Sequence, residues 1–112
     1  MTDTQLTVTL SGGGVDDARA VVRALEGAFG APDQRPSDER ATVHVATFAG
    51  EGQGAAGQTD AGALSAPVSV TLQGTPDAVR RAHDTLRRSF TTRDEGASSG
   101  DQEQERQLLL EP

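Results

Sequence analysis

The chain has 112 residues and a formal net charge of −7, from 17 Asp and Glu residues against 10 basic residues that are all Arg. This length is typical of one domain, and the absence of Cys excludes disulfides and thiolate sites. The acidity disfavours nucleic acid as a partner, because a negative domain gains little from displacing phosphate counterions. No stretch is apolar and long enough to span a bilayer. Met1–Thr4 leads directly into a strand pattern, so we expect a cytoplasmic protein with no membrane partner.

Two segments of the sequence, residues 6–29 and 68–90, carry nearly the same pattern. Each consists of an alternating strand, a turn that contains Gly, and an amphipathic helix pattern that ends in Phe. In this alignment Val8–Leu10 corresponds to Val70–Leu72, and both read VTL. The repeat predicts two similar strand–helix units related by a pseudo-twofold axis.

The first unit begins with a strand over residues 5–11, where apolar and polar residues alternate. Gly12–Gly14 ends this strand, and a helix is predicted over residues 15–29. The chain has no Lys, which excludes a Walker-type phosphate loop and favours a turn without a ligand. Asp16 and Asp17 lie in the first helical turn, where carboxylates complement the free N–H groups. The apolar stripe of this helix consists of Ala18, Val21, Val22, Leu25 and Phe29.

A second strand is predicted over residues 42–48, followed by a long loop. In this strand we expect Val43 and Val45 to point toward the helices and His44 to lie on the opposite, polar face. Residues 49–66 are rich in Gly and Ala and show no periodicity, which predicts a flexible loop.

A third strand over residues 67–73 leads into a second helix with clear start signals, since Thr75 fits the N-cap and Pro76 fits the first helical position. His83 lies at the margin of the apolar stripe, and we expect it to be a partly buried packing residue. The stripe itself consists of Val79, Ala82, Leu86 and Phe90.

Four arginines make this second helix basic: Arg80, Arg81, Arg87 and Arg88. Asp77 and Asp84 lie four residues from arginines, and this spacing predicts a solvated helix face with weak ion pairs. The alternative is a contact with an acidic partner, with the acidic end of the same chain, or with nucleic acid.

Residues 91–112 carry six acidic residues and two Arg, a net charge of −4, and we expect them to form a flexible acidic tail with an apolar end at 107–110. Leu108, Leu109 and Leu110 could form a short edge strand, a motif that docks on another protein, or an unstructured end. The polar run before them favours the docking and unstructured interpretations.

All three predicted strands are apolar mainly on one face, so both helices should cover that face and leave the other open. A right-handed crossover leaves room for a strand between the two strands that it joins. The expected fold is a two-layer α+β sandwich over residues 4–90, with an antiparallel sheet and a βαββα(β) ferredoxin-like topology. In that topology a fourth strand would lie beside the first.

No set of residues converges as a catalytic, metal or cofactor site would require, so we expect a non-enzymatic protein without cofactor or metal. The function predicted from the sequence is that of a small accessory or protein-interaction module that forms a homodimer or docks a partner protein. The candidate contact residues are Thr7, Thr9, His44, Thr71, Arg80, Arg81, Arg87, Arg88, Leu108, Leu109 and Leu110.

Two alternatives stay open at this point. The expected element order is similar to that of ACT-type regulatory domains, and this similarity implies a small ligand held at the first strand–helix turn, here Gly12–Gly14. Nucleic-acid binding through the Arg-rich second helix is the less expected alternative.

Overall fold

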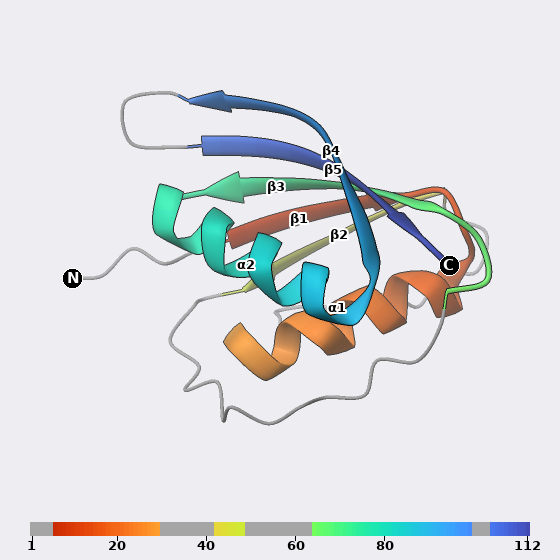
Figure 1. The fold of residues 1–112 in the computed structure, drawn as a ribbon. Coiled ribbons are helices and arrows are strands. Elements are labelled where there is room, and N and C mark those ends of the chain that lie inside the picture. Colours follow the sequence, from red (N-terminus) through yellow and green to blue (C-terminus); the bar gives the residue numbers. More distant parts are fainter. Residues whose placement is uncertain (1–5, 30–41, 49–63, 100–103) are drawn as a thin grey trace.

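The computed structural model describes residues 6–29, 42–48, 64–99 and 104–112, whose arrangement Figure 1 shows. The first five elements have bounds close to those expected from alternation, the glycine turn and the N-cap signal. In chain order the elements are β1 (Leu6–Ser11), α1 (Val15–Phe29), β2 (Val43–Phe48), β3 (Val68–Gly74), α2 (Pro76–Ser89), β4 (Thr91–Ser99) and β5 (Gln104–Glu111). Most of the loop predicted over residues 49–66 lies outside the described residues.

The five strands form one antiparallel sheet in the order β2-β1-β3-β5-β4, and both helices lie on the same face of it (Figure 1). The α+β class and the antiparallel sheet are therefore confirmed. The two helices also pack against each other on that face. The opposite face is not covered by any helix or strand among the described residues.

The ferredoxin-like strand order expected from the sequence is wrong. β1 and β2 are direct antiparallel neighbours with no strand between them, and β5 lies beside β3 instead of β1. The reason lies in the length of the connection after α1. This helix begins just after Ser11 and runs back along the sheet, yet Val43 at the start of β2 pairs with Ser11. Residues 30–42 supply enough chain to return along the sheet, so β2 can enter antiparallel to β1.

The two strand–helix units are related by a pseudo-twofold axis at the centre of the sheet. Thr9 pairs with Thr71, and these two residues are equivalent in the sequence repeat. Val8 pairs with Leu72, which is the equivalent of Leu10, as a twofold axis between β1 and β3 requires. β2 flanks β1 as β5 flanks β3, and both pairs are antiparallel. β2 and β5 are therefore structurally equivalent strands.

The core lies between the sheet and the two helices. All residues of both predicted helix stripes are buried, which confirms these stripes. The aromatic part of the core includes Phe29 and Phe48, whose ring centroids are 5.9 Å apart. Neither of the two described helices is long and apolar enough to cross a bilayer.

The tail expected to be flexible forms two strands of the sheet. β4 and β5 pair with each other, and β5 pairs with β3 from Gln104 to Leu110. Leu108 pairs with Val70 and Leu110 pairs with Val68, and both leucines are fully buried beneath the helices. Leu109 lies between them on the opposite face. The prediction of a flexible tail was wrong because it was based on the polar composition of the segment alone. Pairing with β3, which is distant in the sequence, supplies the hydrogen bonds and apolar contacts that order the segment.

Replacing Leu108 by Ala should lower the free energy of unfolding by about 2–5 kcal/mol, because it removes a fully buried side chain and leaves a cavity. The matched control is Leu109→Ala on the other face of the same strand, which should cost less than about 1 kcal/mol. Urea unfolding of both variants measures the difference. Equal effects would contradict the placement of the C-terminal strand in the core.

Candidate interaction surface

The sheet face opposite the helices carries the surface that the sequence singled out. Thr9 and Thr71 pair at its centre, and Thr7 is their neighbour on β1, so these three candidate residues do lie together. We call the part of this face on β1, β2 and β3 the bare face. It consists of Thr7, Thr9, Ser11, Val43, Val45, Thr47, Ser69, Thr71 and Gln73.

The bare face has no charged side chain. None of β1, β2 and β3 contains an Asp, Glu or Arg, although the whole chain has a net charge of −7. Most of its residues are Thr, Ser or Val, whose short and mostly β-branched side chains make a flat surface. Val43 and Val45 on β2 are its most exposed large apolar residues, each with 51% of its surface accessible.

The expected orientation of β2 is wrong. Phe48 and Ala46 pair with Leu6 and Val8 on the helix-covered face, and both are buried. His44 shares that face and is half-buried, so it cannot contribute to the bare face as expected. The alternation allowed either orientation, and the structure buries the larger Phe ring against Phe29 and leaves two valines exposed.

The remaining part of the open face, on β4 and β5, is charged. Arg93 Nη2 lies 3.5 Å from Glu111 Oε2 across these two strands, and Glu105 shares the same face. Leu109 is half-buried among these polar neighbours. The open side of the sheet is therefore divided into an uncharged region and a charged region.

The glycine turn before α1 is closed by a carboxylate of the same chain. Asp17 Oδ2 accepts a hydrogen bond from the Gly14 backbone N–H at 3.2 Å and from the Ser65 hydroxyl at 2.8 Å. Its Oδ1 accepts from the Ser65 backbone N–H at 2.8 Å. At Gly13, whose φ is +68°, a Cβ would lie only 2.7 Å from Asp17 Oδ2, so this position requires glycine.

The carboxyl group of Asp17 is ionised, and it serves as a structural anchor. Burial alone would raise the pKa of its carboxyl, but hydrogen bonds from Ser65, Gly14 and Ala66 outweigh burial and hold the pKa below its ordinary value. The carboxylate thereby joins the start of α1 to the segment that leads into β3. A negative group already occupies this helix terminus, so the turn offers an anion little attraction.

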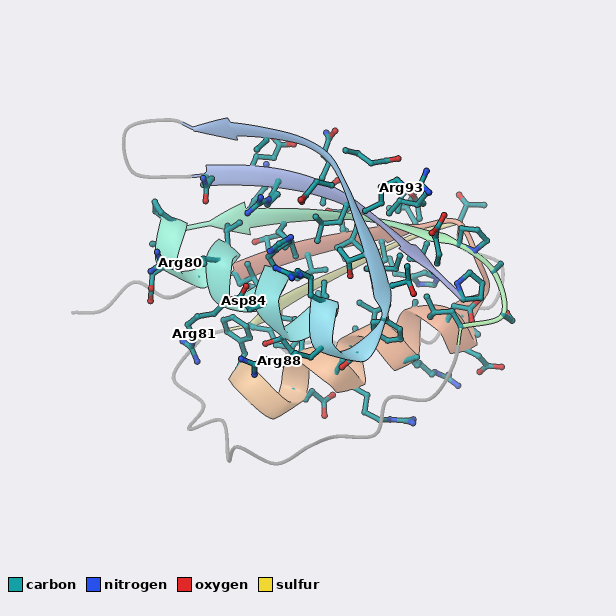
Figure 2. All side chains as sticks on the ribbon, in the orientation of Figure 1. Arg80, Arg81, Asp84, Arg88 and Arg93 are labelled. Atoms are coloured by element: carbon teal, nitrogen blue, oxygen red, sulfur yellow. The ribbon has the colours of Figure 1, made fainter. Side chains whose placement is uncertain are left out.

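Three arginines of α2, Arg80, Arg87 and Arg88, are exposed, and Arg81 is half-buried; Figure 2 labels Arg80, Arg81 and Arg88. Arg80 Nη2 donates to Asp77 Oδ1 at 2.9 Å, an exposed ion pair at a spacing of three residues instead of the four that the sequence suggested. The guanidinium of Arg81 lies 4.8 Å from the centroid of the Phe29 ring and covers the end of the core. Arg87 and Arg88 are exposed in the last turn, where cations complement the helix dipole.

A polar cluster joins α2 to the C-terminal strands. His83 is buried, with 7% of its surface accessible, and its Nε2 lies 3.2 Å from Asp94 Oδ1 on β4. Arg106 Nε on β5 lies 3.3 Å from the same oxygen as an ion pair, without a hydrogen-bond partner of its own. His83 thus packs against β4 and β5. The sequence did not predict these partners, because they lie in the segment that was expected to be flexible.

Sequence reasoning missed the exposed valines of β2 and the Asp17–Ser65 anchor. The size of Phe48 was the only signal in the sequence for the orientation of β2, and nothing in the sequence linked Asp17 to a residue 48 positions away. The described residues contain no group of three or more His, Asp or Glu that could hold a metal ion. No protein-family model, curated protein or solved structure matches the chain.

The anchor predicts a specific loss of stability in acid. The folded pKa of Asp17 is below its unfolded value near 3.8, so its stabilisation is present above that pH and is lost as the pH falls through the folded pKa. Asp17→Asn should lower the free energy of unfolding by about 1–3 kcal/mol at neutral pH. The variant should also lose part of the pH dependence below about pH 4.

Urea unfolding at pH 7, 4 and 2.5 measures both effects. The control is Asp16→Asn, since Asp16 is exposed in the same helical turn and lies 3.7 Å from Arg19. Indistinguishable profiles for the two variants would contradict the anchoring role of Asp17.

Proposed function

We propose that this protein is a non-enzymatic interaction module that associates with a second copy of itself through the bare face and β2. The observation that carries the proposal is the exposure of Val43 and Val45, each 51% accessible, on a surface without charges. Association removes such apolar side chains from water, which is the main favourable term in most protein contacts.

The distribution of charge supports a second copy as the partner. Two chains of net charge −7 repel each other at long range, although physiological salt screens most of this repulsion. Contact through β1, β2 and β3 brings no charged side chains of these strands together. Contact through β4 would instead bring its consecutive charged residues Arg93, Asp94 and Glu95 into the interface. The uncharged half of the sheet is therefore the favoured place for self-association.

The two alternative functions have less support from the described residues. The Asp17 carboxylate accepts the backbone N–H of Gly14 at the glycine turn and that of Ser65 beside it, and a small anionic ligand would need such donors. Arg80 is engaged with Asp77, and Arg81 covers Phe29. Both features have structural roles, so neither favours a ligand sensor or a nucleic-acid-binding protein over an interaction module.

Val45→Lys should weaken self-association by about tenfold or more in dissociation constant, equal to about 1.4 kcal/mol, because it places a charge in an apolar contact. The side chain is exposed in the single chain, so stability should change by less than about 0.5 kcal/mol. Sedimentation equilibrium over a wide concentration range measures the dissociation constants, and thermal unfolding measures stability.

The matched control is Thr91→Lys, which adds the same charge to an exposed residue of β4 at the other edge of the sheet. This variant should associate like the unaltered protein. A protein that stays monomeric at millimolar concentration would contradict the proposed function.

A further inference from the structure

The pseudo-twofold symmetry of the sheet identifies one strand position that is filled in one half and open in the other. β2 and β5 are equivalent, because each is the antiparallel outer neighbour of a strand of the repeat. The outer edge of β5 is paired with β4. The outer edge of β2 has no strand beside it among the described residues. In the part of the chain that the structure describes, the position equivalent to β4 is therefore open beside β2.

The two outer edges of the sheet differ in their capacity to accept another strand. β4 carries the consecutive charged residues Arg93, Asp94 and Glu95, and a bulge between Asp94 and Gly96 interrupts its ladder. Charges and bulges are the features by which natural sheets prevent edge pairing. β2 reads VHVATF, with no Asp, Glu, Arg, Pro or Gly and with a regular register along its whole length. Its edge has the composition of a strand that pairs.

Resting on the proposed function, we infer that β2 pairs antiparallel with β2 of a second copy, so that two five-stranded sheets form one continuous sheet. A twofold axis perpendicular to the sheet keeps the helices of both copies on one side and the bare faces on the other. Residues directly opposite in an antiparallel pair point to the same face. Odd-numbered residues of one β2 must therefore face odd-numbered residues of the other.

One register centres this contact on Val45. It places Val45 opposite its own copy and Val43 opposite Thr47, which are pairs of β-branched side chains of the kind that stabilise sheets. The exposed valines of both copies then lie together on the bare side, and His44 faces Ala46 on the helix side. The chain position between α1 and β2, which corresponds to that of β4, belongs to residues 30–41, which lie outside the described residues.

Disulfide cross-linking tests the contact directly, because the chain has no Cys and one introduced thiol is unique. Directly opposed residues in an antiparallel pair have Cα atoms about 4.5–5.5 Å apart, which a disulfide can bridge. Under mild oxidation Val45→Cys should form covalent dimers at least about tenfold faster than Thr71→Cys at the centre of the bare face, or Ala97→Cys on β4. A mixture of Val43→Cys and Thr47→Cys should cross-link faster than either variant alone.

The outcomes separate this inference from the proposed function, with association of each reduced variant measured by sedimentation in parallel. Fast cross-linking at position 45 with the 43–47 pairing supports the edge contact. Dimers that cross-link through position 71 but not 45 would overturn it in favour of face-to-face contact, and the proposed function would stand. Dimers that cross-link at none of these positions would also overturn it. A strict monomer would overturn both.

Discussion

Two amphipathic helices share a single apolar sheet face, and the rest of the molecule depends on this arrangement. The strands present Leu6, Val8 and Leu10 and their cross-strand partners to that face, and the stripes of α1 and α2 cover them. The core is built almost entirely from aliphatic side chains, with three Phe at most, so its stability depends on burying all of them on one side. The other side of the sheet then needs only residues that tolerate water.

This one-sided construction connects the fold to the proposed function. β4 and β5 bring charged residues to one end of the open face, where Arg93 pairs with Glu111. The strands of the repeat and β2 bring only neutral residues to the other end. An acidic protein built in this way has one region where two copies can approach without bringing like charges together. Of the five strands, only β4 has no counterpart in the other half among the described residues, so the outer edge of β2 in the same region has no described neighbour.

The sequence predicted the local elements well because their signals are local. Alternation, the glycine turn and the Thr75–Pro76 start fixed the first five elements, from β1 to α2, to within a residue or two. Three features depend on distant contacts and were not predictable in this way. The orientation of β2 is decided by Phe48 meeting Phe29, the tail is ordered by pairing with β3, and Asp17 is held by Ser65. The predicted strand order was wrong for the same reason, because the order depends on the long connection between α1 and β2.

The most direct test of the one-sided sheet compares the thiol reactivity of two neighbouring residues of β3 in dilute solution. Thr71→Cys lies on the bare face, and Leu72→Cys lies beneath the helices, where Leu72 is fully buried. The cysteine at position 71, where Thr71 is partly exposed, should react with a maleimide without any opening of the structure. The cysteine at position 72 should react at least about a hundredfold more slowly, because it reacts only when the structure opens. Similar protection at both positions would show that the second face is covered as well, and would contradict the one-sided arrangement of the helices.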